Sequence, residues 1–164
     1  RCMHEMADLG IVLVEQPLPA WNIEGMARLR RRCDLPLLAD ESVFTTHDML
    51  AVAKEGAADA VSLKLVKHGS LADLQKVAAV AEAAGVALYG GCLLESSLGA
   101  SAHLHAFAGL RTLAWGCEHF GPQILKQDLV KQPLRFENFH VHLPQGPGLG
   151  VEIDPLQLAR FARK

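Results

Sequence analysis

The chain has 164 residues, of which half are hydrophobic and 21% are charged, the composition of a soluble globular protein with a sizeable core. Its formal net charge of −2 gives no basic footprint for a nucleic acid, and no apolar run is long enough to span a membrane. The four cysteines form no C-x-x-C pair, so free thiols in a cytoplasmic protein are expected rather than a zinc knuckle.

Apolar runs alternate with helical patterns in the first third of the chain. Residues 1–10 are typical of a helix end with Gly10 as its stop, and residues 11–17 form the first expected strand. A helix follows over 22–33 with Asn22 as its N-cap, and the second strand is expected over 35–41. Thr45 and Asp48 then resemble a capping box, which predicts a helix that ends at Gly56.

The alternation continues to about residue 120 and then changes. The third strand is expected over 60–65, and Ser70 opens an alanine-rich helix that stops at Gly85. The fourth strand, the next helix and the fifth strand are expected over 86–91, 96–110 and 112–118. Residues 133–153 carry prolines and glycines typical of a hairpin, and Asp154 with Pro155 predicts a final helix.

Five strands that alternate with helices predict an α/β fold with βαβ units and a parallel sheet. An open doubly wound sheet and a (β/α)8 barrel both fit this pattern, and neither the Rossmann fingerprint nor a P-loop is present. Charged residues at the carboxyl ends of several strands favour the TIM-like barrel. Because five strands cannot close an eight-stranded barrel, we expect about three βα units upstream of Arg1.

Two carboxylates fall at the ends of neighbouring expected strands, Glu15 after the first and Asp40 after the second. Each taken alone could be a solvated loop residue. Two converging carboxylates are costly to bury without a cation, and Mg²⁺ or Mn²⁺ prefers such oxygen ligands. The matched positions therefore predict a divalent metal site.

Lys64, Glu118 and Glu95 are three further charged residues expected at the same edge. Lys64 interrupts an apolar run and could either snorkel at the rim or transfer protons facing the metal, whereas Lys67 is expected to be solvated. Glu118 follows the fifth strand directly. Glu95 either reaches the same mouth or caps the helix that follows it.

Six segments, taken in order, resemble the enolase superfamily and in particular its muconate-lactonising subgroup, the muconate cycloisomerases. They are "VEQPLP", "ADESV", "VSLKL", "YGGCLLESSLG", "EHFGP" and "GPGLGVEID". The resemblance runs through almost the whole chain. Chloromuconate cycloisomerases, o-succinylbenzoate synthases and dipeptide epimerases are related to this subgroup and stay open as alternatives.

The resemblance implies an isomerase-class enzyme of aromatic catabolism that lactonises cis,cis-muconate, a small dicarboxylate, through an enolate stabilised by Mn²⁺ or Mg²⁺. Glu15 and Asp40 match the family's second and third metal carboxylates. Lys64 matches the lysine of the sixth strand, and Glu118 matches the proton donor of the eighth. Glu95 is a candidate substrate contact. A cytoplasmic homo-oligomer is expected for the full-length enzyme.

The chain also departs from the family pattern. The first metal ligand and the K-x-K base have no counterpart, because the chain begins after both. Residues 1–132 are therefore expected to form strands four to eight of the barrel, and 133–164 a hairpin and helix that contact a capping domain. The chain alone, as the C-terminal half of a cycloisomerase, is expected to be inactive. A non-catalytic remnant or a partner-binding domain with exposed sheet edges is the alternative.

Overall fold

The computed structural model describes residues 2–111 and 113–162. Within them, four parallel strands form one sheet in chain order: β1 (Val14–Glu15), β2 (Leu37–Ala39), β3 (Ala60–Leu63) and β4 (Ala87–Gly90). A doubly wound sheet reverses its strand order at a switch point. The order here shows no such reversal, so the strands wind in one direction, as in a barrel.

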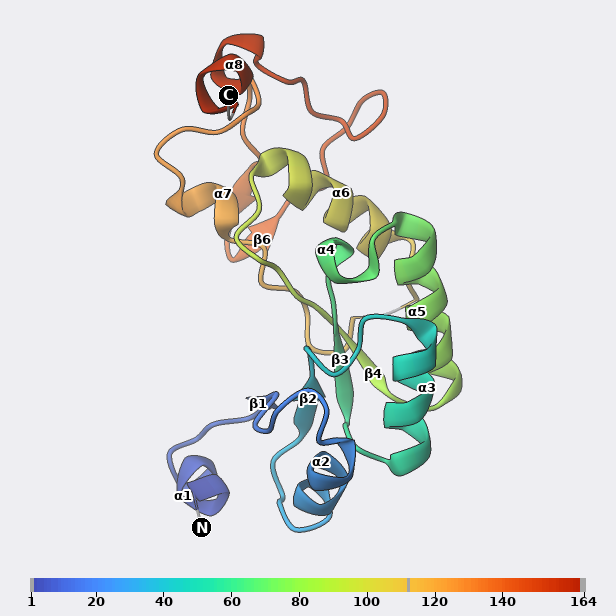
Figure 1. Ribbon diagram of the computed structural model, residues 1–164. Coiled ribbons are helices and arrows are strands. Elements are labelled where there is room, and N and C mark those ends of the chain that lie inside the picture. Colours follow the sequence, from blue (N-terminus) through green and yellow to red (C-terminus); the bar gives the residue numbers. More distant parts are fainter. Residues whose placement is uncertain (1, 112, 163–164) are drawn as a thin grey trace.

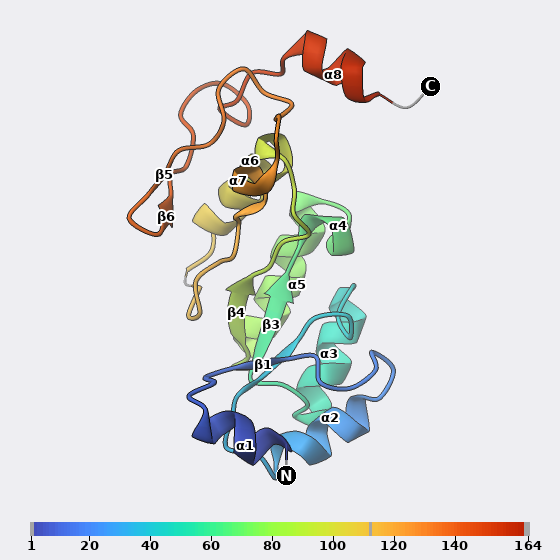
Figure 2. The same ribbon diagram turned by 90° about the vertical axis from the view of Figure 1, so that its left-hand side faces the viewer.

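Helices alternate with the strands along the chain (Figures 1 and 2). They are α1 (Cys2–Asp8), α2 (Ile23–Arg30), α3 (Thr46–Glu55), α4 (Leu65–His68), α5 (Leu71–Ala83) and α6 (Ser97–Ala108). In both views α3 and α5 lie side by side along β3 and β4. The predicted alternation is confirmed, and α1 begins one residue after Arg1, which lies outside the described residues.

Local signals in the sequence set the helix starts. Asn22 accepts the Gly25 N–H at 3.0 Å, and Thr45 exchanges reciprocal hydrogen bonds with Asp48 in a capping box. Gly56 then ends α3 in the left-handed conformation, with φ 60°. The helix predicted over 22–33 is shorter in the structure, where α2 ends at Arg30.

The core lies between the sheet and its helices. Every residue of β2 and β3 is buried, as expected for parallel strands that are covered by helices. The largest fully buried hydrophobic side chains include Met26, Leu37, Leu38, Met49, Leu63, Leu74 and Leu88. Apolar burial therefore fixes β2, β3 and β4 in register, and with them whatever follows each strand.

The fifth expected strand, 112–118, is much shorter in the structure, and its first residue, Thr112, lies outside the described residues. Cys117 forms a single parallel bridge with Gly90. Gly90 donates its N–H to the Gly116 carbonyl at 2.9 Å and accepts the Glu118 N–H at 3.0 Å. Gly116 has φ 73°, a turn conformation that interrupts an extended strand. The two bonds still hold Glu118 beside the end of β4.

The C-terminal region extends beyond α6 (Figures 1 and 2). It contains α7 (Gly121–Ile124), the antiparallel hairpin of β5 (Phe136–Glu137) and β6 (His140–Val141), and α8 (Pro155–Phe161). Asp154 caps α8 by accepting the N–H groups of Leu156 and Gln157. The predicted hairpin and final helix are present, and α8 ends at Phe161; residues 163–164 lie outside the described residues.

All four cysteines are free thiols. In the described part of the chain, no helix combines the length and the apolar character that a membrane crossing needs.

Candidate active site

The carboxyl ends of the parallel strands meet at one edge of the sheet. Glu15 is the last residue of β1, Asp40 follows β2, and Lys64 follows β3. Glu118 follows the Cys117 bridge, which extends the same edge past β4. Because Glu15 pairs with Leu38, its side chain leaves the sheet close to Asp40. The structure therefore brings Glu15, Asp40 and Lys64 together, as the sequence predicts.

A charge cluster forms at this edge, in which Asp40 and Lys64 are buried and the Glu15 side chain is 40% exposed. The Lys64 ammonium contacts Asp40 Oδ2 and lies 3.9 Å from Glu15 Oε1. Burial and the neighbouring Asp40 raise the pKa of Glu15 to about 7. Burial alone would lower the pKa of Lys64, but its hydrogen bond to Asp40 raises that pKa above the ordinary value. The cluster thus holds both carboxyl groups against one ammonium group.

Lys67 belongs to this cluster, so the prediction that it is solvated is wrong. Its side chain is only 6% exposed, and Nζ lies 2.6 Å from Asp40 Oδ1. Nζ also donates to the carbonyls of Asp40 and Ser62, each at 2.8 Å. The chain turns into α4 directly after Lys64, and residues three apart on a helix share one face. Both lysines therefore reach Asp40.

Two ammonium groups oppose the cost of burying the Asp40 carboxylate. Burial by itself would raise the pKa of Asp40, but hydrogen bonds from Lys64 and Lys67 hold it below the ordinary value. Burial lowers the pKa of Lys67 even though Asp40 opposes that shift. Asp40 is therefore the ionised centre of the cluster.

Gln16 positions Asp40 and was not singled out from the sequence. Its side-chain carbonyl accepts the N–H groups of Asp40 at 2.8 Å and Ser42 at 3.2 Å, and its amide donates to the Ser42 hydroxyl at 2.8 Å. Gln16 itself has φ 36°, a strained value for a residue with a side chain. The sequence signal that could have identified it is its position as a polar residue between a strand end and a proline.

Gly91 makes room for the lysine side chain. A Cβ at this position would lie 2.1 Å from Ser62 Oγ and 2.5 Å from Lys64 Cε. Both distances are well inside van der Waals contact. The second glycine of "YGG" therefore lets Lys64 pass beneath the end of β4 toward Asp40.

Glu118 is half-buried and fixed by two donors on the β4 side. Its Oε1 accepts the Cys92 N–H at 3.2 Å. Tyr89 also hydrogen-bonds Glu118, and burial together with this carboxylate raises the pKa of Tyr89. Tyr89 is a second site residue that sequence reasoning missed, although its place at the end of an expected strand was visible.

Glu95 does not cap the following helix. The Asp128 carboxylate accepts the Ser97 N–H at 3.1 Å instead, and Glu95 Oε1 accepts the Leu93 N–H at 2.9 Å. The Glu95 side chain is only 10% exposed and faces two histidines, with His103 Nε2 at 3.7 Å and His119 Nδ1 at 3.9 Å. Burial lowers the pKa of His119 to about 4, so this ring is neutral.

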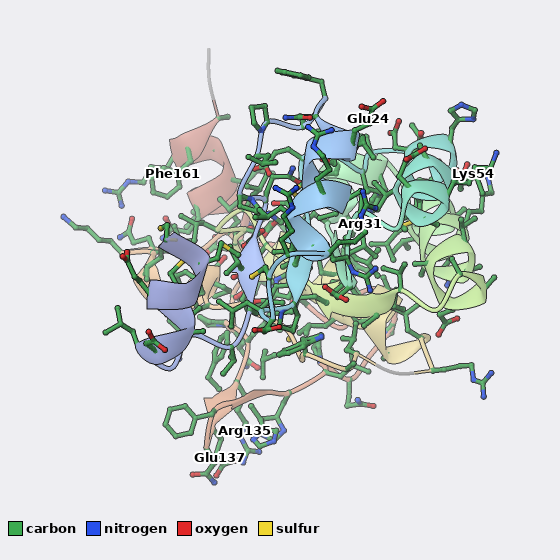
Figure 3. All side chains as sticks on the ribbon, turned by 90° about the horizontal axis from the view of Figure 1, so that it is seen from below. Glu24, Arg31, Lys54, Arg135, Glu137 and Phe161 are labelled. Atoms are coloured by element: carbon green, nitrogen blue, oxygen red, sulfur yellow. The ribbon has the colours of Figure 1, made fainter. Side chains whose placement is uncertain are left out.

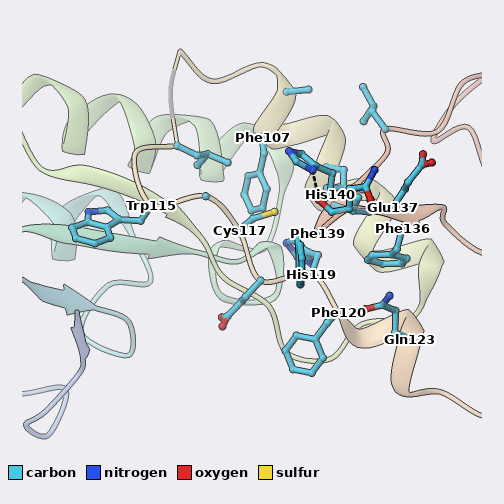
Figure 4. A pocket seen from close by; sticks show the side chains of 18 residues that line it. Phe107, Trp115, Cys117, His119, Phe120, Gln123, Phe136, Glu137, Phe139 and His140 are labelled. Carbon is cyan, nitrogen blue, oxygen red and sulfur yellow. Dashed lines mark hydrogen bonds between the residues drawn. The ribbon is translucent and has the colours of Figure 1, made fainter. Parts of the chain in front are cut away.

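A groove of about 940 Å³ lies beside Glu118 (Figure 4). It runs between the end of α6, residues 113–123 and the β5–β6 hairpin. Most of its walls are apolar, and its aromatic lining residues are Phe107, Trp115, Phe120, Phe136 and Phe139. Of the five predicted site residues, only Glu118 lines it. The groove and the charge cluster are thus different features of the site, because none of Glu15, Asp40 or Lys64 lines the groove.

A family model described as enolase C-terminal domain-like matches residues 1–157. The chain belongs to this family. This enolase-type chain is 44% identical over 164 residues to muconate cycloisomerase 1 of Pseudomonas putida, which covers 100% of the chain and 44% of that relative. It is 42% identical over 158 residues to a chloromuconate cycloisomerase of Cupriavidus necator. That alignment covers 96% of this chain and 43% of that relative.

Solved structures agree with this assignment. A muconate lactonizing enzyme superposes with a TM-score of 0.96 at 44% identity, over 99% of this chain and 45% of that one. The enzyme of Pseudomonas fluorescens complexed with muconolactone also has a TM-score of 0.96, at 41% identity, over 99% of this chain and 44% of its own. The fold is therefore part of a TIM barrel. The enolase-type chain spans less than half the length of these relatives.

Proposed function

We propose that the protein containing this chain is a muconate or chloromuconate cycloisomerase, which lactonises a cis,cis-muconate by adding one carboxylate across the conjugated diene. The observation that carries the proposal is the convergence of Glu15, Asp40 and Lys64 at one sheet edge, with Glu118 at the neighbouring strand end. This convergence occurs in a chain that is 44% identical to a protein named muconate cycloisomerase 1.

We propose Glu15 and Asp40 as ligands of a Mn²⁺ or Mg²⁺ ion. Their carboxyl groups both lie around the Lys64 ammonium, and two ionised carboxylates this close repel unless positive charge joins them. Hard oxygen donors of this kind suit either ion. When bound, the ion would stabilise negative charge that develops on the substrate carboxylate.

Lys64 and Glu118 are proposed as the catalytic side chains of this half of the barrel. Lys64 keeps a buried ammonium beside both carboxylates, so it contributes fixed positive charge where the substrate dicarboxylate would lie. Glu118, oriented by Cys92 N–H and Tyr89, would donate a proton from its carboxyl group to the substrate carbon and then regain one from solvent.

We propose that residues 1–132 supply barrel units and that 133–164 contact a capping domain. Two features support the division. The strands of the first part are parallel and follow one another, whereas those of the second form an antiparallel hairpin. Helix α8 has no buried residue, so its apolar side chains are free to contact another part of the protein.

The activity test uses the protein expressed from its whole reading frame, including any sequence before Arg1. With Mn²⁺ present it should consume cis,cis-muconate or a chlorinated muconate, followed by loss of ultraviolet absorbance. Glu118→Gln should lower kcat by about 10²–10⁴, because a positioned proton donor contributes that much. Glu55→Gln, on an exposed position of α3, is the matched control and should not change kcat. Turnover of a dipeptide without turnover of any muconate would overturn the proposal.

The metal ligands are tested separately by calorimetry. Asp40→Asn should weaken Mn²⁺ binding at least about tenfold, since even residues that only support a ligand contribute 10–100-fold to metal affinity. Asp34→Asn, at an exposed position before β2, is the control and should bind Mn²⁺ as the parent does. Equal affinities in both variants would remove Asp40 from the metal site.

A further inference from the structure

A second group of metal-ligating side chains lies next to Glu118 and is not part of the charge cluster. Cys92, Glu95 and His119 each offer one ligand atom, and these atoms all lie within 4.8 Å of one another. Cys92 and Glu95 follow β4, and His119 follows the Cys117 bridge. Two neighbouring strand ends therefore build this group, whereas the ends of β1, β2 and β3 build the group around Asp40.

His119 is the observation that points to a ligand. The residue is 4% exposed, and neither of its ring nitrogens has a hydrogen-bond partner among the described residues. Buried polar side-chain atoms in native proteins are in large majority paired. Its Nδ1 faces Glu95 Oε2 at 3.9 Å, beyond hydrogen-bonding distance, and Oε2 is itself buried without a partner among the described residues. Two unpaired polar atoms thus face each other in the interior.

The neighbouring His103 shows what a satisfied buried histidine looks like in this fold. Its Nε2 accepts the Leu65 N–H at 2.8 Å, and its Nδ1 lies 2.9 Å from the Gly99 carbonyl. Both nitrogens are used, which makes His103 a structural residue. The two rings are adjacent, with centroids 4.7 Å apart, yet only His119 lacks partners. Burial alone therefore does not explain the unpaired nitrogens.

The three donor types select a particular class of ion. Thiolate and imidazole favour Zn²⁺ and similar transition metals, whereas Mg²⁺ and Mn²⁺ favour oxygen. One thiolate and one carboxylate also neutralise a divalent ion, which a buried site requires. A tetrahedral ion with ordinary Zn–S, Zn–N and Zn–O bond lengths holds its ligand atoms about 3.5 Å apart. Closing these atoms from 4.8 Å needs side-chain movements of about 1 Å.

We propose that Cys92, Glu95 and His119 form a second metal site, which takes a divalent transition-metal ion such as Zn²⁺ and is separate from the Glu15–Asp40 site. The site is linked to Glu118 through Cys92. The Cys92 thiol donates to the Glu118 carbonyl at 3.2 Å, and the Cys92 N–H donates to Glu118 Oε1. Metal binding removes the thiol proton and so breaks the first of these bonds.

Cobalt(II) provides the test, because it substitutes for Zn²⁺ and reports its ligands by absorption. The purified protein, stripped of metal with a chelator and saturated with Mg²⁺, is titrated with Co²⁺ alone. We expect one Co²⁺ per chain, a thiolate-to-cobalt charge-transfer band and the visible bands of tetrahedral coordination. Cys92→Ser should abolish the charge-transfer band. Cys117→Ser, which alters an exposed thiol at the bridge to Gly90, should retain it.

A second measurement covers the possibility that a variant fails to fold. Zn²⁺ should raise the Tm of the parent and of Cys117→Ser, because an ion that binds only the folded state stabilises it. Near-isosteric Glu95→Gln should lower the Zn²⁺ affinity at least about tenfold, the lower bound for changes around a metal site. A parent with no charge-transfer band, a band that survives in Cys92→Ser, or a band lost in Cys117→Ser would each overturn the site.

Discussion

The sheet-and-helix region, residues 14–108, and the C-terminal region, residues 113–162, are stabilised by different means. The larger core cluster runs from Met26 to Phe107 and lies entirely in the first region. The smaller cluster consists of Ala100, Leu104 and Leu134, so the second region contributes one buried residue to it. Burial of apolar area is the main favourable term in folding. The comparison indicates that the first region carries most of the stability.

Apolar packing and hydrogen bonds both hold the C-terminal region to α6. Leu134 is buried against Ala100 and Leu104, and the partly buried residues Phe136, Val141, Leu143 and Val151 pack against this cluster. The Ser97 hydroxyl accepts the Leu134 N–H at 3.1 Å, and the Ser101 hydroxyl donates to the Leu149 carbonyl. Large apolar side chains remain exposed, and Figure 3 shows Phe161 at the periphery of the molecule, as it does Arg135 and Glu137 of the hairpin. The first region is therefore fixed by a large buried core, and the second by a small apolar cluster and a few polar contacts.

A leucine-to-alanine substitution in each region should give the largest difference in unfolding free energy between the two regions. Leu74→Ala removes a fully buried side chain of α5 and should lower the free energy of unfolding by about 2–5 kcal/mol. Leu156→Ala, in α8, removes a side chain that is 81% exposed and should change it by less than about 0.5 kcal/mol. Urea denaturation measures both. Comparable losses would show that the C-terminal region is packed as tightly as the core.

Two glycines test whether the sheet edge is as tightly packed as the core. Gly91→Ala places a Cβ 2.1 Å from Ser62 Oγ, and overpacking of this kind costs about 1–3 kcal/mol of unfolding free energy. Gly109→Ala, at the end of α6, meets no atom closer than 3.4 Å and should be neutral or stabilise by up to about 1 kcal/mol. Mn²⁺ affinity should fall only in Gly91→Ala, because Lys64 must move. An unchanged unfolding free energy and Mn²⁺ affinity in Gly91→Ala would contradict the predicted clash of the added Cβ.

Removal of a helix cap should also affect the stability of the two regions differently, by a smaller amount. Thr45→Ala removes the capping box of α3 and should lower the global free energy of unfolding by about 1 kcal/mol. Asp154→Ala removes the cap of α8, which has no buried residue. It should increase amide hydrogen exchange within α8 and leave global stability unchanged, because α8 opens locally. Equal losses of global unfolding free energy in the two variants would argue against local opening of α8.

The smallest expected effect is a change in pH dependence. Burial lowers the pKa of His68, although its hydrogen bond to the Phe44 carbonyl acts in the opposite direction. The folded state therefore favours the neutral ring. Its contribution to stability is present above the unfolded pKa of about 6.5 and is lost as the pH falls below it.

His68→Gln should accordingly reduce the loss of unfolding free energy between about pH 7.5 and pH 5, even if it lowers stability at neutral pH. His140→Gln, in the exposed hairpin, serves as the control and should leave the pH dependence as it is in the parent. Urea denaturation at both pH values gives the difference. The same slope in parent and His68→Gln would exclude His68 as its source.

Features that depend on nearby residues were predictable from the sequence. The caps at Asn22, Thr45 and Asp154 act within three residues of their partners, and all three are present. The convergence of Glu15 and Asp40 was also predictable, because parallel strands place their carboxyl ends at one edge. The local capping patterns were sufficient for the first prediction, and the parallel direction of alternating strands for the second.

Features that depend on where the backbone turns were not predictable. Lys67 was expected in solvent because it lies just past the expected strand end, whereas α4 begins right after Lys64 and brings Lys67 to Asp40. The partners of Gln16 lie 24 and 26 positions away, so its role depends on tertiary structure. The unpaired ring of His119 likewise depends on the neighbours that the barrel edge supplies. Gly116 shortened a strand whose residue types favoured a longer one.

The chain-order arrangement of the sheet has a consequence for how the protein folds. Val14 pairs with Leu37, Leu38 with Ala60 and Ala60 with Ala87, so each strand pairing joins positions fewer than 30 residues apart. Closing such short loops costs little entropy, and contacts that are local in sequence form quickly. Each βαβ unit can therefore assemble soon after its residues leave the ribosome, with the next strand added to an edge that already exists.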